Sequence, residues 1–229
     1  MSRHLTQRGA LALTAAAAFG AAAWTALEPG RAGLSLLLVA LALIAFGASW
    51  LELAPGSTKE LALIATLAGV AAAGRVLLAA VPGVQPVTVV TMAAGAALGP
   101  RAGMAVGALA ALASNMILGQ GVWTPWQMLG WGLCGVVGAV AGRLLRSRAA
   151  FAALALVLGF AFSALMDLWM WFSFYPHTWE ALAATMARGF PFQAAHAVGN
   201  VLIAFVAGPA LLRILDRYAA RLRTELVWA

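Results

Sequence analysis

The sequence predicts an all-α integral membrane protein, on the evidence of its composition and of its series of long apolar runs. Of the 229 residues, 64% are hydrophobic and 9% are charged, and the mean hydropathy is +0.94. Ordinary soluble domains do not approach these values. A helix that spans a bilayer needs about 20 mostly apolar residues. Such segments predict eight spans, near residues 9–26, 33–51, 60–81, 86–98, 102–119, 125–142, 150–174 and 190–212.

The first two segments consist mainly of Ala, Leu and Gly, and a polar turn separates them from the rest of the chain. This turn reads ELAPGSTKE at residues 52–60, where Ser57 or Thr58 can cap the next helix and Glu60 lies in its first turn. We therefore divide the chain into two extra N-terminal transmembrane helices with their linker (1–58), a six-helix core (59–217) and a basic cytoplasmic tail (218–229).

The fourth segment is too short for a full straight crossing. It begins at Pro86 and ends at Gly99 and Pro100. Backbone groups in hydrocarbon must be satisfied, so an incomplete span needs protein around it. We expect a short or broken helix that packs against other helices.

The basic residues predict the orientation. The net charge of +7 is compatible with a nucleic-acid partner, but the basic residues flank the apolar segments, which is typical of the positive-inside rule. With both termini in the cytoplasm, only Arg31 and Arg188 lie in outside loops. The cytoplasmic side then holds Arg3, Arg8, Lys59, Arg101, Arg143, Arg146, Arg148, Arg213, Arg217, Arg221 and Arg223. We therefore predict a multi-pass protein of the bacterial cytoplasmic membrane, with the lipid bilayer and no nucleic acid as a partner.

In this orientation the polar and aromatic residues of the last six segments gather at the outer ends of these segments. An amide or ionisable group inside a membrane must find a partner, and such groups indicate a functional site. The candidate substrate-binding residues are Arg75, Gln85, Asn115, Gln120, Trp123, Trp126, Gln127, Trp131, Asp167, Trp171, Tyr175, His177, Gln193, His196 and Asn200.

Two alternatives are open for the most polar of these residues. Arg75 and Asp167 either pair with each other or contact a ligand directly. Gln193, His196 and Asn200 are spaced by three and four, so they share one helical face. That face either looks into a cavity or makes interhelical hydrogen bonds, and the similar depth of the neighbouring polar groups favours the cavity.

The aromatic residues indicate the class of ligand. In the segment GQGVWTPWQMLGWG at residues 119–132, we expect Trp123 and Pro125 to shape an entrance loop, and Gln127 and Trp131 to face a pocket. A single Trp is also typical of an interfacial belt. Flat aromatic faces combined with amides and few charges suit a large, partly apolar organic molecule better than an ion.

Patterns for catalysis and for metal binding point away from an enzyme. Neither a P-loop nor an HExxH pattern is present, so we expect no catalytic residue, no intrinsic cofactor and no metal site. The enzymatic alternative is an intramembrane serine hydrolase that uses Ser163 and His196. No GxSxG motif surrounds Ser163, which disfavours this alternative.

Three blocks in order carry a family resemblance. They are VPGVQPVTVVTMAAGAALGPRAGMAVGALAALASN at Val81–Asn115, GQGVWTPWQMLGWGLCG at Gly119–Gly135, and the late aromatic segment at 150–174. On these blocks, residues 59–217 resemble the substrate-binding S component of energy-coupling factor vitamin transporters, a family of six-helix membrane proteins. The two N-terminal helices lie outside the resemblance.

The resemblance implies a transport subunit that binds a vitamin on the extracellular side and is driven by a transmembrane T protein and two ATPase subunits. The PWQM-type sequence looks most like the cobalamin-specific members, and riboflavin, a queuosine precursor or another flat heterocycle is the alternative. The coupling motif AxxxA of the family corresponds to Ala62–Thr66, and Ala65 with Gly69 repeats the small-residue spacing. A purely structural subunit, which retains no ligand, is a further alternative.

Overall fold

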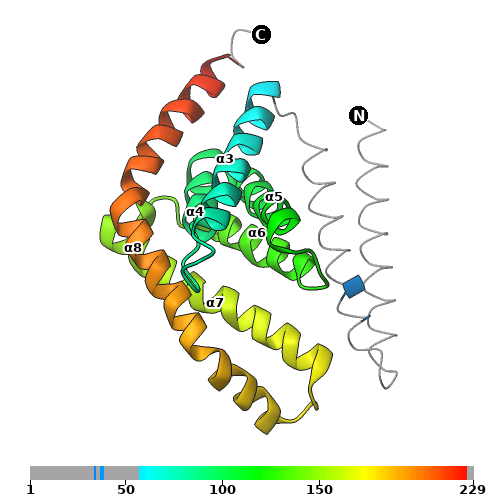
Figure 1. The fold of residues 1–229 in the computed structure, drawn as a ribbon. Coiled ribbons are helices and arrows are strands. Elements are labelled where there is room, and N and C mark those ends of the chain that lie inside the picture. Colours follow the sequence, from blue (N-terminus) through cyan, green and yellow to red (C-terminus); the bar gives the residue numbers. More distant parts are fainter. Residues whose placement is uncertain (1–33, 35–36, 39–56, 226–229) are drawn as a thin grey trace, which may run out of the picture.

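The computed structural model describes residues 34, 37–38 and 57–225 of the chain, and within these residues every regular element is a helix (Figure 1). The predicted N-terminal spans lie outside this part, except that residues 34, 37 and 38 are helical. The described elements are α3 (Thr58–Leu77), α4 (Val87–Leu98), α5 (Pro100–Leu118), α6 (Thr124–Val140), the 3-10 turn η1 (Leu144–Arg146), α7 (Arg148–Phe174) and α8 (Trp179–Glu225).

Local chemistry explains where the helices begin and end. The hydroxyl of Ser57 accepts a hydrogen bond from the Glu60 amide at 3.1 Å and caps α3, as the sequence predicts. Ser147 caps α7 in the same way. Gly99 ends α4 with a φ of +97°, a backbone conformation that residues with a side chain rarely adopt, and Pro100 is the first residue of α5.

Helix α4 lies at the centre of the bundle, where α3, α5, α6 and α8 all pack against it (Figure 1). Its first nine residues, Val87–Gly95, are all buried. Twelve residues of helix reach roughly 18 Å, which is less than the thickness of a bilayer core. The prediction of a short helix that packs against protein is therefore confirmed.

The backbones of α4, α5 and α6 touch because glycines face one another. A Cβ atom on Gly135 of α6 would lie 2.2 Å from the carbonyl carbon of Gly103 of α5, and one on Gly95 of α4 would lie 1.9 Å from the carbonyl oxygen of Gly135. Small residues allow this close approach in membrane helices. Residues 130–135 match the spacing GxGxxG, but they lie inside the continuous helix α6, so they serve helix packing and form no dinucleotide-binding turn.

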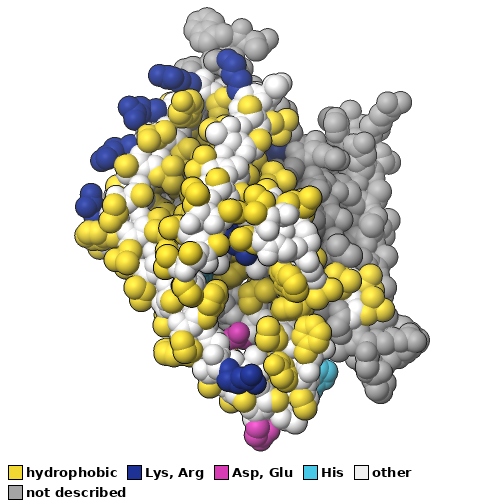
Figure 2. Space-filling model, viewed as in Figure 1, with side chains coloured by type: hydrophobic (Ala, Val, Ile, Leu, Met, Phe, Trp, Pro, Cys, Tyr) yellow, Lys and Arg dark blue, Asp and Glu magenta, His cyan; other side chains and the backbone are white. Residues whose placement is uncertain are grey.

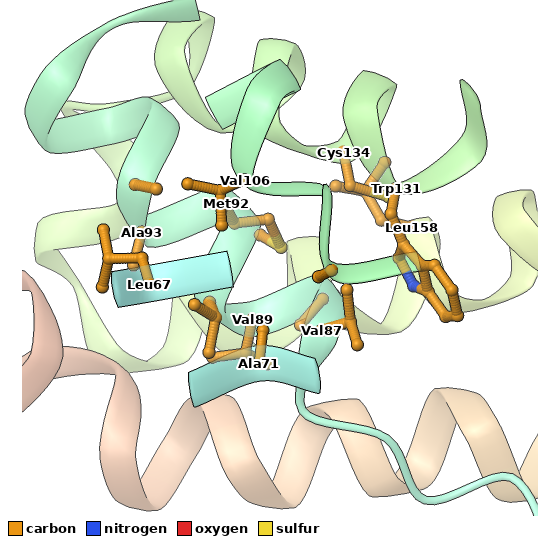
Figure 3. Packing of buried hydrophobic residues seen from close by; sticks show 14 of the residues in the cluster. Leu67, Ala71, Val87, Val89, Met92, Ala93, Val106, Trp131, Cys134 and Leu158 are labelled. Carbon is orange, nitrogen blue, oxygen red and sulfur yellow. The ribbon is translucent and has the colours of Figure 1, made fainter. Parts of the chain in front are cut away.

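The apolar core surrounds α4 (Figure 3). Leu67 and Ala71 of α3 pack with Val89 of α4, while Val106 of α5 and Leu158 of α7 belong to the same buried cluster. Most of these residues are small or β-branched, which fits helices that lie close together. The buried cluster contains residues of all six α-helices from α3 to α8, so it holds these helices together.

Helices α7 and α8 form a long hairpin that projects beyond the other four helices (Figure 1). Helix α8 has 47 residues and contains Pro191 and Pro209. The sequence predicts that this span begins at residue 190 after a loop, but the helix begins at Trp179 and the connection covers only residues 175–178. The prediction is wrong because Pro191, a residue type that commonly opens a helix, here lies within one.

Among the described residues, four helices are long and apolar enough to cross a membrane: α3, α5, α7 and residues 179–222 of α8. Helix α6 has 17 residues and α4 has 12. The visible surface is largely hydrophobic, and a row of basic side chains follows the C-terminal part of α8 (Figure 2), where Arg213, Arg217 and Arg221 are exposed.

Candidate binding site

Arg75, in the last turn of α3, is the centre of a buried polar cluster. Its side chain is 7% exposed. Nε donates to Oε1 of Gln85 at 3.1 Å, and Nη1 donates to the oxygens of Ser114 and Asn115, each at 2.6 Å. All three partners are neutral, so the predicted ion pair between Arg75 and Asp167 is not formed. The cluster instead joins the end of α3 to the end of α5.

Asn115 extends this cluster to α6. While its Oδ1 accepts from Arg75, its Nδ2 donates to the hydroxyl of Thr124 at 2.9 Å and to Oε1 of Gln127 at 2.8 Å. Gln120 lies at the exposed edge, where its Oε1 accepts from Thr124. Because the amides bind one another across the α5–α6 connection, they stabilise the helix ends that the sequence placed at one depth.

Trp131 is fully buried beneath this cluster and does not line the pocket that the sequence predicted for it. The Arg75 guanidinium carbon lies 4.9 Å from the centroid of the indole ring. The ring stacks on Phe162 of α7 at a centroid distance of 4.4 Å, and its Nε1 donates to the hydroxyl of Thr88 at 3.2 Å. Trp131 therefore links α3, α4, α6 and α7.

His196 and Asn200 form a second buried group, on α8. Nδ1 of His196 donates to the carbonyl of Gly83 at 2.7 Å, and Nδ2 of Asn200 donates to Nε2 of His196 at 3.3 Å. Of the two alternatives for the polar face of α8, hydrogen bonding within the protein describes His196 and Asn200, since Gly83 lies in the connection between α3 and α4 and the second bond stays within α8. The oxygen of Asn200 has no hydrogen-bond partner in the described part of the chain.

A pocket of about 370 Å³ lies between α7 and α8, between the buried groups and the 175–178 connection. We refer to it as the α7–α8 pocket. From α7 it is lined by Phe162, Ser163, Met166, Asp167 and Met170. The connection contributes Tyr175, and α8 contributes Thr185, Arg188, Gly189, Phe192 and Gln193.

Asp167 and Gln193 meet across this pocket. Nε2 of Gln193 donates to Oδ2 of Asp167, so the carboxylate has a neutral partner. A Cβ atom on Gly189 would lie 3.0 Å from Oδ1 of Asp167, which shows how closely the α8 backbone approaches the carboxylate. Of the predicted polar face of α8, only Gln193 lines the pocket.

The remaining predicted site residues lie outside the α7–α8 pocket. Trp126 packs with Trp169 in a small separate cluster, and Trp123 is exposed and covers Gly121. Trp171 donates to the carbonyl of Pro176 at 3.0 Å. His177 stacks on Phe172 next to Trp171. These last contacts organise the α7–α8 connection.

Ser163 and His196 do not form a catalytic dyad. The Ser163 residue is 5% exposed and its hydroxyl has no hydrogen-bond partner within the described residues, while both His196 nitrogens bind other groups. Within residues 57–225 no group of three His, Cys, Asp or Glu side chains is placed to hold a metal ion.

Sequence reasoning names Asp167, Tyr175 and Gln193 as binding residues and misses the other eight residues that line the pocket. Met166 and Met170 resemble ordinary apolar residues of a span, and Thr185, Arg188 and Gly189 fall in the predicted loop. A usable signal is present, because Thr185, Gly189 and Gln193 are each four residues apart, as are Phe162, Met166 and Met170. Sequence reasoning also misses three buried hydroxyl residues, because such residues are common in membrane helices. They are Thr88, Ser114 and Thr124.

The predicted coupling residues lie on an exposed face of α3. Ala62, Ala65, Thr66 and Gly69 are all exposed, and the Thr66 hydroxyl donates to the Ala62 carbonyl at 2.8 Å. Beside this face, a groove of about 570 Å³ separates the first turns of α3 from the last turns of α8. A Cβ atom added to Gly69 would have no described atom of another element within 4 Å.

In the part of the chain that the structure describes, every regular element is helical and four helices have membrane-spanning length and apolarity, which is the make-up of a multi-pass membrane protein. The chain belongs to a family of unknown function, DUF6580, whose model matches residues 56–218. The match covers α3 to α7 and most of α8. Neither the curated proteins nor the solved structures include a match to this chain.

Proposed function

We propose that this protein is the substrate-binding subunit of a membrane transporter and that it holds a small organic micronutrient in the α7–α8 pocket. The observation that carries the proposal is the pocket itself, in which Asp167, Gln193 and Ser163 lie among apolar side chains of two membrane-type helices. Binding sites for small molecules commonly combine an apolar wall with a few convergent polar groups. Ionisable groups within membrane helices mark substrate sites in membrane proteins.

The buried cluster around Arg75 supports this function as a scaffold. It fixes the ends of α3, α5 and α6 through Gln85, Ser114 and Asn115. Trp131 stacks on Phe162, which itself lines the pocket, so the cluster also supports one wall of the pocket. A rigid support of this kind lowers the conformational entropy that the protein loses when a ligand binds.

The resemblance to S components supplies the transport role, and the positive-inside distribution of the basic residues supplies the orientation. In this proposal the 175–178 connection faces outwards, and the basic side chains along the end of α8 face the cytoplasm. A T protein contacts the exposed small-residue face of α3 around Ala62 and Gly69, and two ATPases provide the energy. The chain itself performs no chemistry.

The size of the pocket bears on the substrate. A volume of about 370 Å³ lies near the lower end of the range for small-molecule sites, which is about 300–1,000 Å³. A corrinoid is larger than this pocket and must extend beyond it. Cobalamin therefore stays the candidate from the resemblance, and a smaller heterocycle such as riboflavin fits the pocket volume better.

Ligand retention tests the proposal. The full chain, purified in lipid nanodiscs, is dialysed against cyanocobalamin, riboflavin and other vitamins, and the bound molecules are quantified by mass spectrometry. We expect one of them to be retained at micromolar concentration, and Gln193→Leu to weaken its retention. Gln120→Leu, at the exposed edge of the polar cluster, is the matched control and should retain it fully.

Uptake in cells tests the transport role separately. We expect accumulation of the retained vitamin only when a T protein and two ATPases are expressed together with this chain. Ala62→Leu should reduce uptake and leave retention unchanged, because it fills the coupling face and not the pocket. Retention of no vitamin, or uptake that is independent of the partners, would contradict the proposed function.

A further inference from the structure

We propose that the α7–α8 pocket selects a small amphoteric molecule, with a cationic or N–H-bearing group held by Asp167 and Ser163 and an acidic group held by Arg188. This inference rests on the proposed function, because it takes this pocket as the ligand site. It adds the charged groups that the ligand carries, which neither the family nor the resemblance assigns.

Asp167 supplies an acceptor whose bonding is incomplete. Its Oδ2 accepts from the Gln193 amide, and within the described residues no Lys or Arg forms a salt bridge with it. A carboxylate in a membrane helix normally pairs with a cation or with several donors. Gly189 leaves room for the carboxylate beside the α8 backbone. A ligand ammonium or N–H group in the pocket would complete its hydrogen bonding with a charge-assisted bond.

Ser163 provides an independent indication of a missing partner. It lies four residues before Asp167, so both side chains share one face of α7, and both line the pocket. The residue is 5% exposed, yet its hydroxyl has no hydrogen-bond partner in the part of the chain that the structure describes. A buried hydroxyl without a partner costs about 1–3 kcal/mol. The pocket therefore offers a polar ligand a second unused group, one helical turn from Asp167.

Arg188 gives the pocket its opposite charge. It lies on α8, lines the same pocket and is exposed, and it forms no salt bridge with Asp167. Two opposite charges that line one small pocket without pairing leave both available to a ligand. Between them, Phe162, Met166 and Phe192 form an apolar wall.

This arrangement disfavours ligands that carry only one kind of charge. A simple acid would meet the carboxylate of Asp167, and a simple amine would gain nothing from Arg188. A molecule with both groups on a flat or apolar frame satisfies the carboxylate, the hydroxyl and the guanidinium together. A pocket of about 370 Å³ restricts this frame to a small one.

Three probes of nearly equal shape test the proposal on the full chain in nanodiscs: 4-(aminomethyl)benzoate, 4-methylbenzylamine and 4-methylbenzoate. Binding is measured by ligand-observed NMR. We expect the zwitterion to bind about tenfold more tightly than either single-charge probe, which corresponds to about 1.4 kcal/mol.

Variants assign the two charges. Asp167→Asn should abolish the advantage of the zwitterion over 4-methylbenzoate, and Arg188→Gln should abolish its advantage over 4-methylbenzylamine. Arg213→Gln removes an exposed arginine elsewhere on α8 and should change neither ratio. Equal binding of the three probes, binding of none of them at millimolar concentration, or unchanged ratios in both pocket variants would overturn the proposal. Since the vitamin-retention experiment is separate, a retained vitamin combined with any of these results would leave the proposed function intact.

Discussion

The guanidinium of Arg75 lies over the indole of Trp131, at 4.9 Å from the ring centroid, and this contact joins a polar cluster to an aromatic stack. Arg75 binds three neutral oxygens, and Trp131 carries the contact on to Phe162 at the pocket. A cation over an aromatic face gains electrostatic energy that grows when water is absent. A guanidinium without a carboxylate partner is thereby accommodated among membrane-type helices.

Replacing Arg75 tests how much this cluster contributes to stability. Arg75→Met leaves the oxygens of Gln85, Ser114 and Asn115 without their donor, so we expect the free energy of unfolding to fall by about 3 kcal/mol. Arg75→Lys should lie between this variant and the wild type, because an ammonium cannot reproduce the planar fork. Unfolding in detergent, followed by circular dichroism, measures both.

Arg213→Met is the control for this experiment. Arg213 is exposed on α8, so its replacement should change the stability by no more than about 0.5 kcal/mol. Equal stability of the Arg75→Met and Arg213→Met variants would show that the cluster around Arg75 does not stabilise the fold.

Thr88 tests the buried hydrogen bond of Trp131. Thr88→Val keeps the shape of the side chain but leaves the indole N–H without an acceptor, which should cost about 1–3 kcal/mol. Thr91→Val is the matched control on the same helix, since the Thr91 hydroxyl donates only to a carbonyl of its own helix. We expect the control to lose about 1 kcal/mol or less. Near-ultraviolet circular dichroism, which reports on the packing of Trp side chains, should change more in Thr88→Val than in Thr91→Val. A control as damaging as Thr88→Val would contradict a specific role for the indole bond.

Sequence patterns are sufficient to predict the ends of helices that have clear capping or helix-breaking residues. Ser57 caps α3 as predicted, and the Pro86 and Gly99–Pro100 boundaries predict the short α4. These signals are local, since a cap or a proline acts within one turn. The beginning of α8 carries the same kind of local signal, which the prediction missed: the Thr178 hydroxyl accepts from the Ala181 amide at 3.3 Å, and Glu180 lies in the first turn. Pro191 and the charged Arg188 drew the predicted start to residue 190 instead.

The polar residues of the site could be located along the helices but not paired. The sequence indicates that Arg75, Asn115 and Asp167 lie at related depths, and the structure places the first two in one cluster and the third in the pocket. Which groups meet depends on helix rotation and on the close approach at Gly103 and Gly135. Helix rotation and close approach are set by the packing of the whole bundle, so no local sequence pattern predicts them.

The bridge between Arg146 of η1 and Asp216 of α8 provides a prediction about salt. Nη2 of Arg146 lies 2.9 Å from Oδ1 of Asp216, and both side chains are partly exposed, at 48% and 35%. An ion pair in contact with water contributes up to about 1 kcal/mol and is screened by ions. Asp216→Asn should therefore lower the melting temperature slightly at low salt and have no effect at high salt. The charge-exchanged double variant, Arg146→Asp with Asp216→Arg, should recover the loss, and a loss that persists at high salt would contradict this account.

Two glycines that occupy opposite environments provide the last prediction. A side chain on Gly135 would meet the Gly103 backbone at 2.2 Å, so Gly135→Ala must push α5 and α6 apart and should cost about 1–3 kcal/mol or more. Gly69 lies on the exposed face of α3 with no described atom of another element within 4 Å of an added Cβ, so Gly69→Ala should raise the helix stability by about 0.5–1 kcal/mol. Thermal unfolding of the two variants in one detergent checks the expected loss of stability in Gly135→Ala and the expected gain in Gly69→Ala.

Because Gly69 also lies on the face proposed for the T protein, Gly69→Ala should show reduced ATP-driven uptake. A Gly69→Ala variant that is both more stable and fully active would place the coupling contact elsewhere.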